Sequence, residues 1–311
     1  MNSVFSLVLL LAFLAAGFFA ARLTPVGAFR PLAKVFDAIL WALLFSMGLR
    51  MGQDRGLFSS LGSIGLLSLA VAVVTVAGTV GAHLLLAPVY RALSGASLAR
   101  RAGRAERPGI IERIRHPLFL LALVLAGAAA GFVLPGFAVV SDGTLSGWIL
   151  YALLFIIGIQ MEPLGVRVFR SLASPVTALV PLVTVLGTLL GSLTLVFFED
   201  VTPGTALALG SGFGWYSLSG ILIADLGNPA LGAAAFLANL LRELFAFFLI
   251  PLLANTGRPE AGIGVGGATS MDVTLPLLEE SWGPSVVPLC LAHGCLLSLA
   301  VPFLVPLFMG L

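Results

Sequence analysis

Apolar stretches long enough to cross a lipid bilayer recur from one end of this chain to the other. A helix needs roughly 18 or more apolar residues to span a hydrocarbon core about 30 Å thick. Because the bilayer core offers no water to unpaired backbone groups, continuous stretches of this length are expected to fold as helices. We predict eight strong spans, at residues 4–21, 35–49, 61–88, 117–134, 148–161, 175–198, 230–253 and 285–309.

Composition supports the same class. Only 10% of the 311 residues are charged, whereas soluble domains are about 25% charged. No nucleotide, zinc or nucleophile motif occurs, and Cys290 and Cys295 lie inside an apolar run, where a disulfide framework is not expected. The first apolar run lacks a preceding basic residue, so it is interpreted as a span rather than a cleaved signal. The sequence predicts an all-α polytopic membrane protein that is not an enzyme and has no cofactor or metal.

Two further stretches, 204–224 and 262–278, are apolar but rich in glycine, serine and threonine. Non-helical backbone is tolerated at membrane depth only where protein or a water-filled cavity surrounds it. We therefore expect two broken or re-entrant elements that line a cavity. Eight helices plus these two elements, and ten full helices, fit the sequence equally well.

The distribution of arginine and lysine predicts the orientation. If the loop at 91–115, which holds seven arginines, is cytoplasmic, twelve basic residues face the cytoplasm and two face outward before residue 200. Both termini are then periplasmic, in a bacterial cytoplasmic (inner) membrane. The predicted units are a three-helix membrane unit at 1–90, a basic cytoplasmic loop at 91–116 and a transport unit at 117–311. The loop is expected to lie beside anionic lipid rather than to bind nucleic acid.

An internal repeat is predicted at an offset of 110 residues. The segment Leu-Trp-Ala-Leu-Leu-Phe at 40–45 returns as Leu-Tyr-Ala-Leu-Leu-Phe at 150–155, and Gly48 and Met51 return as Gly158 and Met161. Three spans separate the two copies, so the copies cross the bilayer in opposite directions. Inverted repeats of this kind are typical of secondary transporters. Chance similarity between two leucine-rich helices is the alternative.

Ionisable residues inside spans mark the candidate site, because each costs roughly 2.5–3.5 kcal/mol at a helix centre. Arg242 and Glu243 lie in the middle of the span at 230–253, and Asp272 lies in the second broken element. Asn239 shares a helix face with Glu243, whereas Arg242 is rotated from Glu243 by about 100°. One arginine cannot neutralise two buried carboxylates, so a cationic substrate is expected to do so. A structural pair between Arg242 and a carboxylate is the alternative.

Polar residues of the two broken elements complete the candidate site. The run Gly-Phe-Gly-Trp-Tyr-Ser-Leu-Ser-Gly at 212–220 has glycines that free backbone groups for a ligand and aromatic rings that can hold an ammonium by cation–π contact; a tightly packed helix crossing is the alternative. His293 is interpreted as a packing residue, with a proton relay as the alternative. The predicted substrate- and proton-binding residues are Glu243, Asp272, Asn239, Arg242, Trp215, Tyr216, Ser217, Ser219, Thr269 and Ser270.

These motifs resemble the LysO-type lysine exporter family. The resemblance rests on Ser-Gly-Phe-Gly-Trp-Tyr-Ser-Leu-Ser-Gly-Ile-Leu at 211–222, Arg-Glu-Leu at 242–244, Gly-Ala-Thr-Ser-Met-Asp at 267–272 and Thr-Leu-Pro at 274–276, and it covers about residues 203–311. His-Gly at 293–294 and Leu-Ser at 297–298 also resemble the last helix of that family. The resemblance implies export of L-lysine and thialysine from the bacterial cytoplasm, with two intramembrane acids that match Glu243 and Asp272. Asn239 departs from the pattern, because some relatives carry aspartate there, and this puts the substrate range in question.

The predicted mechanism is proton antiport. Moving a lysine cation outward opposes the membrane potential by about 2.3 kcal/mol per 100 mV, and exchange for one inward proton cancels that cost. A carboxylate that binds either a proton or the substrate ammonium enforces the exchange. The alternative function is a proton- or sodium-coupled transporter of an organic anion, with Arg242 holding the substrate carboxylate; an intramembrane protease lacks its spacing signatures. A homo-oligomer is compatible with the sequence.

Overall fold

The computed structural model describes residues 3–23, 32–53, 61–94, 110–133, 148–159, 174–197, 201–226 and 228–310. All regular secondary structure in these ranges is helical. Within the described residues, four helices are long and apolar enough to cross a membrane, and three shorter apolar helices accompany them. The predicted helical, multi-pass architecture is confirmed, while the choice between eight and ten spans stays a prediction. Most of the basic loop at 91–116, as well as Met161, lies outside the described residues.

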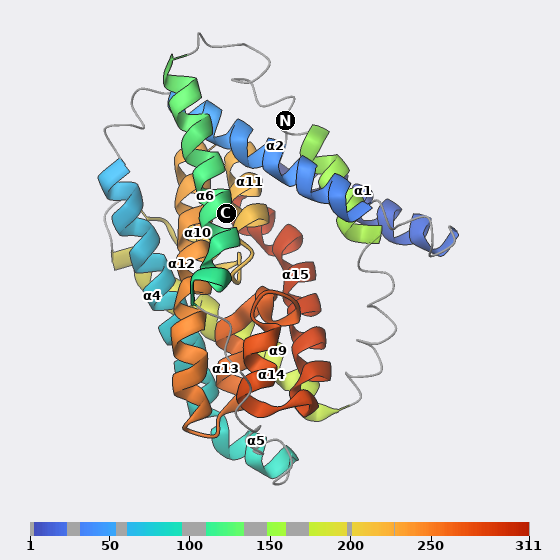
Figure 1. Ribbon diagram of the computed structural model, residues 1–311, viewed down its shortest axis with the longest axis vertical. Coiled ribbons are helices and arrows are strands. Elements are labelled where there is room, and N and C mark those ends of the chain that lie inside the picture. The colour runs from blue at the N-terminus through green and yellow to red at the C-terminus, as the bar shows by residue number, and fades with distance from the viewer. Residues whose placement is uncertain are drawn as a thin grey trace.

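The arrangement of the helices in space is shown in Figure 1. In chain order they are α1 (Ser3–Leu23), α2 (Leu32–Gln53), α4 (Leu61–Leu85), α5 (Ala87–Ser94), α6 (Ile110–Val133), helix Trp148–Ile159, α9 (Pro175–Leu193), η3 (Thr194–Phe197), α10 (Pro203–Gly210), α11 (Tyr216–Asp225), α12 (Pro229–Ala254), α13 (Pro259–Gly266), η4 (Gly267–Met271), α14 (Leu275–Trp282), η5 (Pro284–Val286) and α15 (Val287–Met309).

Glycines let several of these helices touch backbone to backbone. A Cβ on Gly17 of α1 would collide with the carbonyl of Phe155, and a Cβ on Gly127 of α6 would collide with the carbonyl of Phe45. Gly127 lies 110 residues after Gly17, and Phe45 lies 110 residues before Phe155, so the two contacts join equivalent positions with their roles exchanged. Two more contacts obey the same shift: Gly48 meets the carbonyl of Val124, and Gly158 meets the carbonyl of Leu14. Small residues of this kind are how helices approach closely in membranes.

Helices α4 and α9, the third long helices of the two repeat copies, meet each other. Gly78 of α4 lies against the backbone of Gly187 in α9, and the hydroxyls of Thr79 and Thr188, which are 109 residues apart, are 2.7 Å apart. The described helices of residues 3–85 and 110–193 thus exchange partners as a twofold relation would require, with Thr79 and Thr188 close together where its axis would pass. The contacts therefore support the repeat that the sequence predicts.

The first broken element consists of α10 and α11. Pro203 begins α10, and the Thr202 side chain caps it by accepting the Thr205 N–H. The backbone then leaves the helix over 211–215, where Phe213 and Gly214 have positive φ values of 48° and 96°. Helical hydrogen bonding resumes at α11. The predicted interruption of this segment is therefore present.

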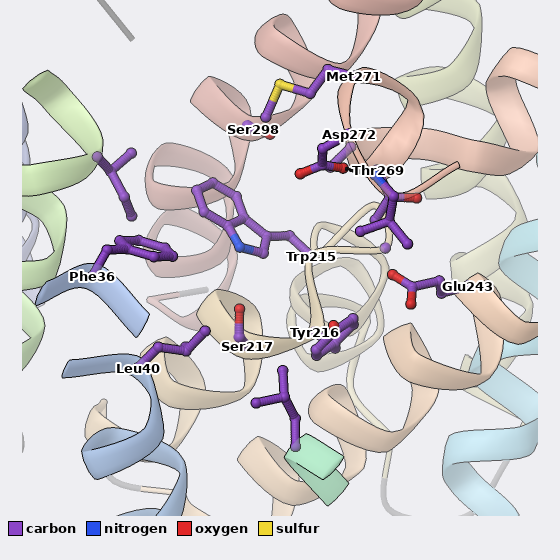
Figure 2. Close-up of a pocket in the computed structure, with 15 residues that line it drawn as sticks. Phe36, Leu40, Trp215, Tyr216, Ser217, Glu243, Thr269, Met271, Asp272 and Ser298 are labelled. Carbon is purple, nitrogen blue, oxygen red and sulfur yellow. Dashed lines mark hydrogen bonds between the residues drawn. The ribbon is translucent and has the colours of Figure 1, made fainter. Parts of the chain in front are cut away.

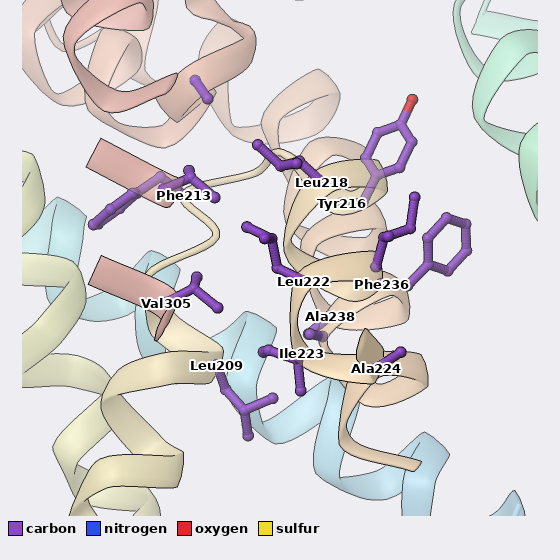
Figure 3. Close-up of a cluster of buried hydrophobic side chains, with 14 of the residues drawn as sticks. Leu209, Phe213, Tyr216, Leu218, Leu222, Ile223, Ala224, Phe236, Ala238 and Val305 are labelled. Carbon is purple, nitrogen blue, oxygen red and sulfur yellow. The ribbon is translucent and has the colours of Figure 1, made fainter. Parts of the chain in front are cut away.

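The second broken element consists of α13, η4 and α14. Gly267 turns the chain at the end of α13 with a φ of 62°, a conformation that favours glycine. The Ala268 N–H donates to the Phe213 carbonyl (2.8 Å), so the interruptions of the two elements touch. In Figure 1, α10 and α11 lie in the upper half of the molecule, and α13 and α14 lie in the lower half. Buried apolar side chains, including Phe213, Leu218 and Val305, pack around the first interruption (Figure 3).

Candidate functional site

A cavity of about 220 Å³ opens beside the two interruptions. Ligand pockets for drug-sized molecules are about 300–1,000 Å³, so this volume suits a smaller molecule. Its polar lining includes six of the ten residues predicted from the sequence (Figure 2). These six are Trp215, Tyr216, Ser217, Glu243, Thr269 and Asp272.

Glu243 presents an uncompensated carboxyl group to the cavity. It lies in α12 with 1% of its surface exposed, and neither Oε1 nor Oε2 has a hydrogen-bond partner among the residues that the structure describes. Burying a charged group without partners is costly, and buried polar groups are normally hydrogen-bonded. The carboxyl group is therefore available to a ligand or a proton.

Asp272 occupies the open part of the same cavity. It follows η4 and is exposed, and its Oδ1 accepts the N–H of Val273. Figure 2 shows Asp272 and Glu243 on the same side of the Trp215 ring. The cavity thus contains two carboxyl groups in different settings, one enclosed and one open.

Arg242 points away from the cavity. It is 2% exposed, and its guanidinium donates to the Gly264 carbonyl (3.0 Å) and to the hydroxyls of Thr79 (3.2 Å) and Thr188 (3.5 Å). All three are neutral oxygens, so Arg242 forms no structural ion pair with a carboxylate in the described part of the chain. Gly264 lies in the last turn of α13, where a positive charge is favourable. Arg242 and Glu243 therefore face different surroundings, as their separation around the helix predicts.

Asn239 and Ser219 lie behind the cavity wall. Asn239 accepts the Gly214 N–H (2.7 Å) and donates to Ser219 Oγ (3.1 Å) and the Ala235 carbonyl (2.9 Å). A Cβ on Gly212 would collide with the same amide. The oxygen and the nitrogen of the Asn239 amide are both used in these bonds, which hold the interruption between α10 and α11. Its geometry favours a positioning role over direct contact with a ligand.

Ser270 also lies behind the wall, in a chain of neutral hydrogen bonds. Its hydroxyl bonds His293 Nδ1 (2.9 Å), and Thr184 links His293 Nε2 to His83 Nε2, each at 2.9 Å. The chain ends at Tyr90, which bonds His83 Nδ1 (2.9 Å). No cluster of metal-ligating side chains is found in the ranges described. The chain ties η4 to α4, α9 and α15.

The wall of the cavity outside the two broken elements was not predicted from the sequence. Helices α2, α6 and Trp148–Ile159 contribute an apolar wall that consists of Phe36, Leu40, Leu120 and Ile157. Apolar side chains on apolar helices carry no signal that distinguishes this wall from a lipid-facing surface. Ser298 of α15 also lines the cavity, near Met271.

Comparison with known proteins gives the family. The family model described as "Lysine exporter LysO" matches residues 11–105 and 121–309. The chain belongs to the lysine exporter LysO family. It is 42% identical over 202 residues to "Lysine exporter LysO" of Escherichia coli (strain K12), which covers 65% of this chain and 67% of that protein. It is also 32% identical over 189 residues to "Putative lysine exporter" of Haemophilus influenzae, which covers 61% of this chain and 96% of that protein.

Membership extends the resemblance over the helices that precede residue 203, beyond the motifs of the last third. It places the chain in a family of amino-acid exporters rather than of enzymes. The cavity and its two carboxyl groups are therefore considered as parts of a membrane transporter.

Proposed function

We propose that this chain is a secondary active exporter of L-lysine, and of analogues such as thialysine, across the bacterial inner membrane by exchange for protons. The two relatives named as lysine exporters support the substrate. The observation that carries the mechanism is the Glu243 carboxyl group, buried without a partner among the described residues in the cavity that Asp272 also lines. A lysine side chain brings the positive charge and the hydrogen-bond donors that these acids lack.

The side-chain ammonium of the substrate binds between Glu243 and Asp272, over the face of Trp215, where cation–π attraction adds to the charge interaction. The substrate carboxylate binds at the N-terminus of α11, where Ser217 lines the cavity and the helix dipole favours negative charge. Asn239 and Ser219 position the interruption, and Thr269 and Tyr216 complete the wall. Each proton that occupies a carboxyl group displaces a substrate ammonium, so the two ions exchange.

The proposed topology has eight spans and two re-entrant elements. Each broken element lies in one half of the molecule in Figure 1, which supports re-entry from opposite faces. The excess of basic residues in the loop at 91–115 supports a cytoplasmic position for that loop and periplasmic termini. Residues 1–90 and 117–311 then flank a cytoplasmic loop at 91–116.

Transport of an organic anion is less well supported. It requires a cation in the binding site, and no basic side chain is among the described residues that line the cavity. The nearest candidate, Arg242, donates to neutral oxygens behind the wall.

Neutralising the two acids tests the proposal. Glu243→Gln and Asp272→Asn should abolish export of labelled lysine from cells and resistance to thialysine, while the protein stays in the membrane. Glu260→Gln is the matched control, because Glu260 is also a buried carboxyl group but does not line the cavity. Normal export by either cavity variant would refute the proposed role of the acids.

A further inference from the structure

Ser298 shares two unusual properties with Glu243. Its side chain is 1% exposed, and its Oγ has no hydrogen-bond partner among the described residues. It also lines the same cavity, from α15 rather than α12. A buried hydroxyl normally finds a partner, and leaving it unpaired costs free energy. The buried hydroxyls of Ser68, Ser219 and Ser270 each have one.

A second internal repeat relates Ser298 to Glu243. A shift of 55 residues takes Pro229 to Pro284 and Pro251 to Pro306, at the start and near the end of α12 and of the η5–α15 segment. The same shift takes Phe213 to Ala268, the two residues that bond each other where the interruptions touch. It takes Glu243 to Ser298. The two helices thus present polar side chains to one cavity from equivalent positions.

The contacts of the neighbouring turn obey the same relation. In the first broken element, Gly212 lies against Asn239 of α12. In the second, the Ala268 carbonyl and the Met271 side chain, which follow the counterpart Gly267, lie against Gly294 of α15. Gly294 is the counterpart of Asn239. Each helix therefore packs on one interruption and, one turn later, reaches the cavity with Glu243 or Ser298.

We infer that Ser298 is a specificity-determining residue of the cavity, whose hydroxyl accepts a hydrogen bond from the substrate ammonium opposite Glu243. This inference rests on the proposed export of lysine. An ammonium has three N–H donors, and Glu243, Asp272 and Ser298 together offer it acceptors from α12, the second broken element and α15. A hydroxyl supplies an acceptor without adding a third negative charge, so one bound cation does not face three carboxylates.

Ser298→Ala tests the inference through binding to the purified full-length protein in detergent, measured by calorimetry with lysine. Losing one hydrogen bond to a charged group should weaken lysine binding by roughly 10- to 100-fold. The melting temperature without lysine should not fall, because no bond within the described part of the protein is lost. Ser298→Cys, which keeps the shape but is a weak acceptor, should weaken binding similarly.

Ser68→Ala is the matched control. Ser68 is a buried serine whose hydroxyl donates to the Ile64 carbonyl (2.6 Å) and lies 3.2 Å from the Ala234 carbonyl, away from the cavity. This variant should lower the melting temperature and leave lysine affinity unchanged. A structural role for Ser298 would give the Ser68 result instead, and would overturn the inference.

Lysine methyl ester separates the two ends of the substrate. If Ser298 contacts the ammonium, Ser298→Ala weakens binding of lysine and of the ester by the same factor. If only lysine binding weakens, the hydroxyl contacts the carboxylate and the assignment is wrong. Unchanged affinity in Ser298→Ala, with wild-type protein that binds and exports lysine, overturns this inference alone, whereas wild-type protein that does not export lysine overturns the proposed function.

Discussion

Replacing Arg242 by lysine separates the two functions that the sequence leaves open. The guanidinium bonds the Gly264 carbonyl and the Thr79 hydroxyl through a single nitrogen, with a longer contact to Thr188 through the other. A lysine ammonium keeps the charge but is shorter and lacks the planar fork. Each bond that is not remade costs about 1.5–3 kcal/mol. That is a large part of a typical stability of about 5–15 kcal/mol.

We therefore expect Arg242→Lys to lower the melting temperature of the detergent-purified protein clearly, while the KM for lysine in proteoliposomes stays within about twofold of the wild type. Because Arg242 lies outside the cavity lining, we expect the substrate not to contact it. Arg258→Lys is the control, since Arg258 precedes α13 and is only half-buried, and it should change neither quantity. A KM that rises severalfold while stability is unchanged would show that Arg242 contacts the substrate and would favour the organic-anion alternative.

Three further predictions concern coupling, folding and substrate orientation. With one-for-one proton exchange, a gradient of one pH unit across proteoliposomes should support a lysine gradient of about tenfold, and an imposed potential of 100 mV should leave that gradient unchanged. If lysine crossed alone, the same potential would change the lysine gradient by about 50-fold. A change of that size contradicts proton exchange. Gly267→Ala should reduce both stability and transport, because its φ is 62° and a Cβ would collide with the Phe213 carbonyl, whereas Gly65→Ala, with open space around it, should be tolerated; normal transport by Gly267→Ala would refute the need for this contact. Ser217→Ala should weaken binding of lysine but not of 1,5-diaminopentane, which has no carboxylate; equal effects in a binding titration would place the carboxylate elsewhere.

The spans and their interruptions were predictable because their signals are local. Most of the long helices in the described ranges begin and end within a few residues of their predicted apolar runs. The interruptions follow from glycine at Gly214 and Gly267, where the backbone has positive φ. The repeat was visible through Gly48 and Gly158, which make equivalent contacts. Gly17 and Gly127 make the other equivalent pair of contacts, but the sequences around them differ too much to reveal it.

The site was predictable only in part, because a sequence gives the face of one helix and not the neighbour that this face meets. Asn239 and Glu243 share a face, yet Asn239 is used to hold the interruption and Glu243 reaches the cavity. Ser270 and Asp272 lie two residues apart, and only Asp272 lines the cavity. Ser298 matched the family resemblance but was not predicted as a site residue, because a serine in an apolar helix usually bonds its own backbone, as Ser68 does.

Buried polar side chains with and without hydrogen-bond partners distinguish the fixed part of the site from the part that is open to a ligand. Arg242 bonds Thr79 and Thr188, the hydroxyls that meet between the two copies of the first repeat, and it also bonds the last turn of α13. That turn leads into the contact between Phe213 and Ala268, which are equivalent positions of the second repeat. The charge of Arg242 is committed to this junction and cannot also follow a substrate. Glu243, one residue further along α12, is left with no partner in the described chain. Under the proposed function, this arrangement leaves the acids in the cavity to be neutralised by a bound substrate cation or by a proton, because Arg242 bonds neutral oxygens behind the wall.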